Sequence, residues 1–346
     1  MVRRLSVLDQ SPIAAGSTGA DALRRTIDLA RHTESLGYHR YWVAEHHGTP
    51  MLACAAPEAL IGPIASATTS IRVGSGGVML PHYSPLKVAE TFSMLSGLYP
   101  HRIDLGLGRA PGSDPLTAFA LQRDRRQPAP DDFPEQLAEL LAYLHDALPA
   151  RHQFAKLSQL PGRPEIPDVW LLGSSPQSAI WAAELGLSYA FADFINPAGA
   201  DIVARYREEL AVRSAEGDGR ELRSETRQPP GDVIVCGWAL CADTDEEAQR
   251  LGASARMAFA KMLQGQSIPV PPAEEAVQFL AANGSAADAL VRRRRWIVGA
   301  PAAVRAGIEA LAEEYGAEEA MIVTITHDHE ARRRSYALIA REFGLA

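Results

Sequence analysis

The sequence predicts a (β/α)8 TIM barrel of the α/β class with insertion loops, and three observations support this prediction. Short apolar runs alternate with segments of helical periodicity, which is the pattern of parallel strands joined by crossover helices. Eight such runs fit into 346 residues, a length that suits one large barrel domain. The first run leads into Asp9-Gln10-Ser11 and lacks the G-x-G-x-x-G turn that an open dinucleotide-binding sheet would carry.

The first four strands and their helices follow from apolar runs and from residues that begin or end helices. Gly37 is placed to end the first helix, Ser84 and Pro85 are placed to begin the third, and Pro63 should kink the second or shorten it by a turn. The predicted elements are strand 5–8, helix 21–36, strand 41–44, helix 57–69, strand 71–74, a helix from 85 through 95, and strand 102–106. Together they form the first half of the barrel.

The second half continues the alternation with longer connections. Gly186 and Gly316 are placed to end helices, and Thr244 with Glu247 predicts a capping box. The predicted elements are helix 133–148, strand 169–172, helix 176–185, strand 189–192, helix 197–212, strand 233–240, helix 244–263, helix 304–315, strand 320–325 and helix 331–343. We expect a single domain over 1–346, with irregular insertions near 111–131, 149–168, 214–231 and 265–295.

Charge and cysteine content narrow the possible functions. The net charge of −8 has the wrong sign for a protein that gathers nucleic acid phosphates. Cys54, Cys236 and Cys241 lack metal-binding or redox spacing, so we expect small buried thiols in a reducing compartment. The apolar run at the N-terminus is too short for a signal peptide, and no run is long enough to span a membrane. We therefore expect a cytoplasmic protein that binds neither nucleic acid nor membrane.

The loops that follow the barrel strands share one face, which is where a TIM barrel carries its chemistry. After the second strand come Glu45, His46 and His47. These histidines could be loop residues bonded to backbone, or they could include a general acid/base. A metal site is disfavoured because adjacent side chains point to opposite sides and no other cluster completes a ligand shell.

Glycines and a single arginine follow the third and fourth strands. Ser75, Gly76 and Gly77 form a segment in which the backbone can let a flat ring approach closely, although a plain turn or bulge would use the same residues. Arg109 stands in an apolar, glycine-rich segment and is suited to reach an anion in the barrel mouth. It could equally be a structural salt-bridge partner.

Three serines surround the start of the helix after the fifth strand. Ser174, Ser175 and Ser178 would bring hydroxyl groups to free backbone N–H groups and to the positive end of the helix dipole, which predicts a phosphate site. An ordinary N-cap would explain Ser174 or Ser175, but not both. No P-loop lysine follows, which disfavours a nucleoside triphosphate.

Seven segments that span nearly the whole chain carry a resemblance. They are LSVLDQSP at 5–12, ESLGYHRYWVAEHH at 34–47, IRVGSGGVMLPHYSPLKVAETF at 71–92, RIDLGLGRAPGSD at 102–114, LLGSSPQSAIWAAELGL at 171–187, WIVGAP at 296–301 and RRRSYALIA at 332–340. In these segments the chain resembles the luciferase-like monooxygenase family, which includes the bacterial luciferase subunits and many flavin- or deazaflavin-dependent oxidoreductases. It looks most like the non-luminescent, alkanal monooxygenase-like branch.

The resemblance implies a barrel, usually a homodimer, that binds reduced FMN (FMNH2) across its mouth. In such proteins a bulge at the third strand, here Ser75, Gly76 and Gly77, lies behind the flavin ring and often contains a non-prolyl cis peptide. The residues that hold the phosphate map to Arg109, Ser175 and Ser178, and the catalytic histidine maps to His46. Light emission is not expected, because position 108 is glycine where luciferase has a reactive cysteine.

The resulting hypothesis is an FMN-dependent monooxygenase that uses O2 to oxidise a small organic substrate, with a separate flavin reductase supplying FMNH2. His46 would act as acid/base and Glu45 would orient or charge-balance it. Arg109, Ser174, Ser175 and Ser178 would neutralise the phosphate, and no metal is expected. Two alternatives remain. One is F420-dependent hydride transfer, which a basic groove containing Arg123, Arg125 and Arg126 would favour; the other is a non-catalytic flavin carrier.

Overall fold

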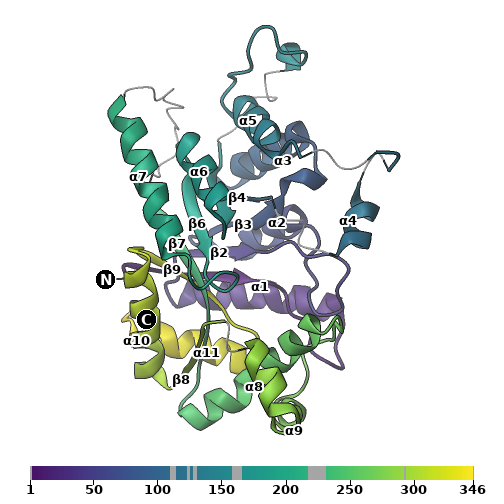
Figure 1. Ribbon diagram of the computed structural model, residues 1–346, viewed down its shortest axis with the longest axis vertical. Coiled ribbons are helices and arrows are strands. Elements are labelled where there is room, and N and C mark those ends of the chain that lie inside the picture. Colours follow the sequence, from purple (N-terminus) through teal and green to yellow (C-terminus); the bar gives the residue numbers. More distant parts are fainter. Residues whose placement is uncertain are drawn as a thin grey trace.

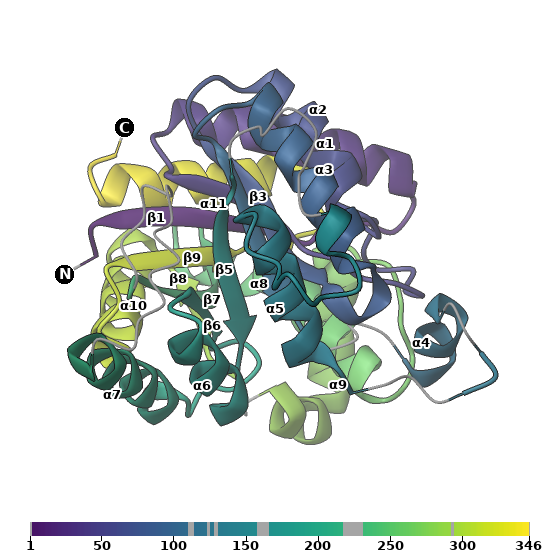
Figure 2. The same ribbon diagram turned by 90° about the horizontal axis from the view of Figure 1, so that it is seen from above.

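A computed structural model of the chain describes residues 2–109, 114–122, 125–127, 131–157, 166–216, 231–291 and 294–345. Within these ranges the chain forms a closed parallel barrel surrounded by helices (Figure 1; Figure 2). No helix in the described ranges is both long enough and apolar enough to cross a membrane.

Eight strands close the barrel. They are β1 (Arg4–Asp9), β2 (Arg40–Val43), β3 (Arg72–Met79), β4 (Ile103–Gly108), β5 (Asp168–Gly173), β6 (Ser188–Ala192), β7 (Val233–Cys241) and β9 (Glu319–Val323). The strands from β1 to β7 pair in parallel, each with the next. β7 then pairs with β9, and β9 pairs with β1, which closes the ring. The predicted TIM barrel and its eight strands are confirmed.

A further strand, β8 (Trp296–Gly299), lies outside the ring and was not predicted. It pairs only with the last four residues of β7, from Trp238 to Cys241, beyond the residues of β7 that pair with β6. Four residues are too few for a recognisable alternation of apolar and polar side chains. The strand therefore exists because β7 extends past the barrel and offers an open edge.

The helices pack around the barrel and over its carboxyl end (Figure 2). They are α1 (Gly19–Ser35), α2 (Pro57–Ala67), α3 (Pro85–Leu98), α4 (Pro115–Leu121), α5 (Phe133–Leu144), α6 (Pro176–Glu184), α7 (Ala200–Glu216), α8 (Asp245–Leu263), α9 (Ala273–Val291), α10 (Pro301–Glu314) and α11 (His329–Glu342), with short 3₁₀ turns η1 (Leu80–His82) and η2 (Ala155–Leu157). All helices predicted from the sequence are present, with ends that differ by a few residues.

Four local predictions need correction. The segment expected to be irregular at 111–131 contains α4, which Asp114 caps by accepting from the backbone N–H groups of Leu116 and Thr117. Pro63 does not interrupt α2, which continues four residues past it. The segment expected to be irregular at 265–295 contains α9, because Ala276 packs against Met257 of α8 and gives that helix a small core of its own. Thr244 caps α8, but the Glu247 carboxylate bonds Arg250 and so takes no part in a capping box. Most of the predicted insertion at 214–231 lies outside the described residues.

Side chains of the strands divide between two cores. On β2, Tyr41 and Val43 belong to the large core between the barrel and its helices, whereas Trp42 and Ala44 belong to the core inside the barrel. This alternation is the two-residue period of a strand. It fixes which side each residue faces as the chain continues past Val43 toward the mouth.

A buried layer of charges fills the amino end of the barrel interior. Arg40 is fully buried and contacts Asp104 at 3.0 Å and Glu319 at 2.8 Å, with its guanidinium 4.7 Å from the ring centre of Trp170. Arg72 binds the other oxygen of Asp104, and the Trp42 indole N–H donates to Asp104 at 2.8 Å. These ion pairs fill the amino end of the barrel interior, on the side opposite the mouth.

Candidate active site

His46 lies where β2 opens into the barrel mouth. Its backbone N–H donates to the Cys54 carbonyl oxygen at 2.9 Å, which ties the loop after β2 to the segment before α2. His46 lies three residues past the end of β2, and from the alternation of Trp42 and Ala44 we infer that it faces the interior side, with Glu45 and His47 on the outer side. The histidine predicted to act as acid/base is therefore on the side that faces the mouth.

The imidazole of His46 has an unused ring nitrogen. Its Nδ1 is buried and has no hydrogen-bond partner among the described residues. Burial, and then the neighbouring His47, lower the pKa of His46 to about 4, so the ring is neutral at neutral pH. A buried polar atom without a partner costs free energy unless a ligand or water satisfies it. This atom is the strongest sign of a binding site in the mouth.

The Glu45 carboxylate contacts His47 and not His46, which corrects the direct contact expected from the sequence. Its carboxylate is fully buried, contacts Nε2 of His47 at 2.8 Å and accepts from the backbone N–H of Met79 at 3.0 Å. The physical reason is the alternation of side chains: Glu45 and His47 share the outer side, and His46 faces the opposite way.

The glycine-rich end of β3 forms the predicted bulge. The pairing register with β4 shifts between Gly76 and Val78, and the peptide bond between Gly76 and Gly77 is cis, as the resemblance implied. A Cβ atom at position 76 would collide with Leu8, and one at position 77 would lie 2.7 Å from the Gly106 carbonyl oxygen. Close packing within the barrel therefore requires both glycines, whether or not a flat ring also approaches them.

The hydroxyl of Ser75 is used by a hydrogen-bond partner within the barrel. Its hydroxyl donates to the Gly106 carbonyl oxygen at 2.9 Å and accepts from the Gly106 N–H at 3.0 Å, and the residue is fully buried. The side chain thus links β3 to β4. Any contact of Ser75 with a cofactor would have to come from its backbone.

Arg109, just past the end of β4, is exposed and already holds an anion. Its guanidinium donates to both carboxylate oxygens of Asp131, at 2.7 and 2.9 Å, and lies 5.5 Å from the ring centre of Trp181 on α6. The Asp131 carboxylate shows that this arginine can bind an anion. It also means that a phosphate would have to displace Asp131.

The three serines after β5 differ in what their hydroxyls do. Ser175 is the N-cap of α6 and forms a capping box with Ser178. The buried Ser178 hydroxyl is also 2.8 Å from the Tyr189 hydroxyl and donates to the Ser175 carbonyl oxygen, so it points away from any ligand in the mouth. Ser174 is half-buried, and its hydroxyl has no partner among the described residues. Ser174 and the exposed Ser175 are thus the two serines that an anion can reach.

An aromatic cluster at the β6–β8 side of the mouth was missed by the sequence analysis. The rings of Trp238 and Trp296 stack with centres 4.2 Å apart, Phe194 stacks on Trp238 at 5.8 Å, and Phe259 of α8 lies edge-on to both indoles. The Trp238 indole N–H is buried without a partner among the described residues. Two tryptophans directly opposite each other on paired strands could be recognised only after β8 was known.

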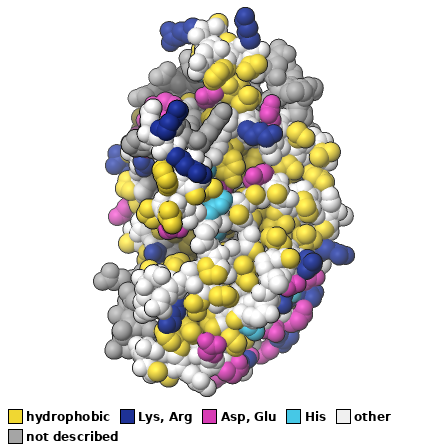
Figure 3. Space-filling view, turned by 90° about the vertical axis from the view of Figure 1, so that its right-hand side faces the viewer, with side chains coloured by type: hydrophobic (Ala, Val, Ile, Leu, Met, Phe, Trp, Pro, Cys, Tyr) yellow, Lys and Arg dark blue, Asp and Glu magenta, His cyan; other side chains and the backbone are white. Residues whose placement is uncertain are grey.

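Figure 3 shows the right-hand side of Figure 1, toward which β1 runs. Near the centre of this face histidine atoms are visible among hydrophobic side chains, with Lys and Arg side chains above them. The polar side chains follow β2, β4 and β5, whereas the aromatic cluster involves β6, β7 and β8, and β5 pairs directly with β6. The carboxyl end of the barrel therefore carries both polar groups and an aromatic cluster.

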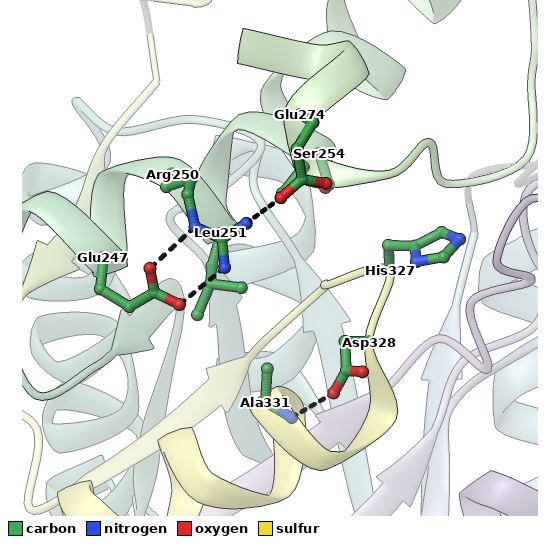
Figure 4. Close-up of a pocket in the computed structure, with 9 residues that line it drawn as sticks. Glu247, Arg250, Leu251, Ser254, Glu274, His327, Asp328 and Ala331 are labelled. Carbon is green, nitrogen blue, oxygen red and sulfur yellow. Dashed lines mark hydrogen bonds and ion pairs between the residues drawn. The ribbon is translucent and has the colours of Figure 1, made fainter.

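Two cavities in the described structure contain none of the predicted site residues. One, of about 410 Å³, lies between α8, the start of α9 and the start of α11, where Arg250 bridges Glu247 and Glu274 (Figure 4). The other, of about 540 Å³, lies along α4 and includes Arg125 and Arg126. Among the described residues, no cluster of three or more His, Cys, Asp or Glu side chains could hold a metal ion.

Comparison with known proteins agrees with the sequence resemblance. Residues 4–319 match the luciferase-like monooxygenase family. The chain is 38% identical to a luciferase-like monooxygenase of Escherichia coli (strain K12), covering 96% of this chain and 95% of the relative. It is 37% identical to an N-acetyl-S-alkylcysteine monooxygenase of Bacillus subtilis (strain 168), covering 97% of each chain.

Solved structures give the same result. The apo form of MsnO8 superimposes with a TM-score of 0.83 at 40% identity and 99% coverage of both chains. At 20% identity or less, where only the fold is shared, the barrel matches an FMN complex of the oxygenating constituent of 3,6-diketocamphane monooxygenase and an F420-dependent secondary alcohol dehydrogenase, with TM-scores of 0.70 and 0.67. By sequence and by fold, this chain belongs to the luciferase-like monooxygenase family.

Proposed function

We propose that the protein is a monooxygenase that uses reduced FMN and O2 to oxidise a small organic substrate. The observation that carries the proposal is the buried, unpartnered Nδ1 of His46 on the interior side of the barrel mouth. In a chain of this family, a neutral imidazole at that position is suited to accept or donate a proton beside a bound cofactor. A separate flavin reductase would supply the reduced flavin, and the protein would act as a homodimer.

The polar groups on β4 and β5 fit the phosphate of FMN. Arg109 already binds a carboxylate, and Ser174 and Ser175 stand at the N-terminus of α6, where backbone N–H groups and the helix dipole favour an anion. Gly76 and Gly77 would lie behind the flavin ring, with Ser75 contributing backbone only. Ser178 would support the site indirectly by holding Ser175.

Bound reduced FMN would supply the electrons that activate O2, so that one oxygen atom enters the substrate and the other leaves as water. His46 would hold or transfer a proton at Nδ1, and its low pKa keeps that nitrogen available as an acceptor at neutral pH. Trp42, Leu8 and the other apolar side chains inside the barrel would exclude water from beneath the cofactor.

The substrate class most worth testing is a thioether. A relative that is 37% identical is an N-acetyl-S-alkylcysteine monooxygenase. The aromatic cluster of Phe194, Trp238, Phe259 and Trp296 would accommodate an apolar S-substituent, and the free Trp238 N–H would donate to an acceptor on the substrate.

A second candidate function is F420-dependent hydride transfer without O2. The observation in its favour is the cavity along α4, where Arg125 and Arg126 supply positive charge for the longer acidic tail of F420. Arg123, the third arginine expected in this groove, lies outside the described residues.

Anaerobic titration of the purified protein with FMNH2 and, separately, with reduced F420 would decide between these functions. The FMN complex would then be mixed with ¹⁸O2 and N-acetyl-S-methylcysteine, and products would be analysed by mass spectrometry. The monooxygenase proposal requires tighter binding of FMNH2 and ¹⁸O in a product. Preferential F420 binding without oxygen uptake would support hydride transfer. FMN binding without turnover on a panel of thioethers, aldehydes and ketones would indicate a flavin carrier.

A further inference from the structure

Glu45 lies behind the candidate site and connects two strand ends. Its fully buried carboxylate accepts from the Met79 backbone N–H at 3.0 Å through Oε2 and contacts Nε2 of His47 at 2.8 Å through Oε1. Tyr83, next to η1, also hydrogen-bonds this carboxylate through its hydroxyl. Three groups from the β2 end and the β3 end thus converge on one side chain.

The backbone pairing between β2 and β3 ends before either strand reaches the candidate site. The last paired residues are Val43 and Ser75. His46 lies three residues beyond Val43, and the bulge that contains Gly76 and Gly77 begins directly after Ser75. Without ladder hydrogen bonds, another contact has to set the distance between the loop that carries His46 and the bulged end of β3.

The carboxylate of Glu45 supplies that contact. It reaches from the outer side of the β2 end to Met79, the last residue of β3, and so spans the region where pairing is missing. It also holds the side chain of His47, so the residues on both sides of His46 are fixed from behind. One side chain thus stands in place of the missing ladder hydrogen bonds.

We propose that Glu45 is a positioning residue, which replaces the missing β2–β3 pairing and sets the geometry of His46 relative to the bulge at Gly76–Gly77. The effect on turnover rests on the function proposed above, whereas the effect on the β3 backbone does not. The reach of the side chain matters in this role, and its charge does not. Gln can still accept from Met79, but Asp, one methylene shorter, cannot reach.

The test compares Glu45→Gln with Glu45→Asp, and includes Glu45→Ala and the control Glu58→Gln. Glu58 is a half-buried carboxylate close enough to Glu45 to influence it electrostatically, but its Oε2 has no hydrogen-bond partner among the described residues. Amide hydrogen exchange over residues 76–80 would be measured without flavin. With flavin, kcat and KM for N-acetyl-S-methylcysteine and the circular dichroism of bound FMN would be recorded.

We expect Glu45→Asp and Glu45→Ala to speed exchange at 76–80 by about tenfold, the fold-change expected for a lost hydrogen bond. In these variants kcat should fall by at least about tenfold with little change in KM, and the dichroism of bound FMN should change. Glu45→Gln should stay within about threefold of the wild type in each readout, as should Glu58→Gln.

Two outcomes would overturn the proposal. One is a Glu45→Asp variant that matches the wild type while Glu45→Gln is impaired, because that result would assign the role to charge. The other is unchanged exchange at 76–80 in a folded Glu45→Ala or Glu45→Asp variant. If the wild type binds no flavin and oxidises no probe, the proposed function fails, and the exchange data still decide the role of Glu45.

Discussion

The two ends of the barrel interior use polar residues in opposite ways. At the amino end, Arg40, Asp104 and Glu319 are buried and paired with one another and with the partly exposed Arg72. At the carboxyl end, His46 Nδ1 is buried and unpartnered among the described residues, and the nearby cation Arg109 is exposed.

This difference indicates which end of the barrel contributes to the stability of the fold and which end contributes to binding and catalysis. The charges at the amino end form ion pairs with one another, and the loss of one partner would strand the other. Unpartnered groups at the carboxyl end lower stability but provide binding and proton transfer, as in barrels generally. Substitutions at the amino end should therefore affect folding, and those at the carboxyl end should affect binding or turnover.

The largest effect is expected at the amino end. Asp104→Ala would leave Arg40 and Arg72 without a shared carboxylate in a buried layer, which should lower the free energy of unfolding by about 3–5 kcal/mol. Urea denaturation measures this change. Asp243→Ala, which removes an exposed partner of Arg334, serves as the control and should change stability little. Equal stability of the two variants would contradict the comparison.

At the carboxyl end, His46→Ala should leave folding nearly unchanged and lower turnover by about 10²–10⁴-fold, the usual contribution of a general acid/base. Steady-state kinetics with saturating FMNH2 measure turnover, and a flavin titration checks that binding is retained. His152→Ala is the control, since His152 lies before η2 and its Nδ1 accepts from the Phe154 backbone N–H. Normal turnover in His46→Ala would remove this residue from the mechanism.

Arg109→Ala should weaken FMN binding by roughly 1.5–3 kcal/mol, the size of a hydrogen bond to a charged group. Because the side chain is exposed, we expect the lower part of this range. Asp131→Ala provides a test of opposite sign, because it removes the carboxylate that competes with the phosphate. Its FMN dissociation constant should be equal to or lower than that of the wild type. Fluorescence titration of FMN measures both, and an unchanged constant in Arg109→Ala would rule out the assignment.

The serines allow a smaller test of the same comparison. Ser174→Ala should weaken FMN binding by about 0.5–1.5 kcal/mol without changing stability, because only its hydroxyl is free. Ser178→Ala should instead lower stability by about 1 kcal/mol, since its hydroxyl supports the cap of α6 and contacts Tyr189. Thermal unfolding and FMN titration of both variants separate the two roles. The reverse result would show that Ser178 is the ligand.

The pH dependence of unfolding tests the burial of the neutral His46 ring. Burial lowers the pKa of His46 and of His39 to about 4, below the value of about 6.5 for an unfolded histidine. Between these values the unfolded chain binds more protons, so stability should fall as the pH drops from 6.5 to 4. His46→Gln should make this decline shallower. An unchanged slope in urea titrations at several pH values would show that His46 is not buried in its neutral form.

The barrel was predictable because local sequence patterns indicate its strands and helices. Strands buried on both faces give continuous apolar runs, and their helices give a longer period. Three elements were missed because their sequence patterns are weaker. β8 has four residues, and α4 has seven residues of which none is buried. α9 follows a proline-rich segment and packs mainly on α8, so its apolar positions reflect a neighbour that the sequence does not reveal.

The candidate site was predictable by position and only in part by role. Strand ends identified His46, Arg109 and the serines of α6, since side chains at the carboxyl ends of barrel strands share one face. The partner assigned to Glu45 was wrong because the alternation of side chains separates it from His46. The Ser75 hydroxyl was expected near the cofactor but is used by Gly106 of the next strand.

The sequence by itself determined the order of strands and helices, the family, and the types of polar residue at each strand end. These depend on local periodicity and on short motifs. Only the tertiary structure decided which of those polar groups are free. Ser178 is taken by Tyr189 and Asp104 by Arg40 and Arg72, whereas Nδ1 of His46 has no such partner in the described chain. A hydrogen bond or ion pair depends on atoms brought together from distant parts of the chain, and that proximity is a property of the folded barrel alone.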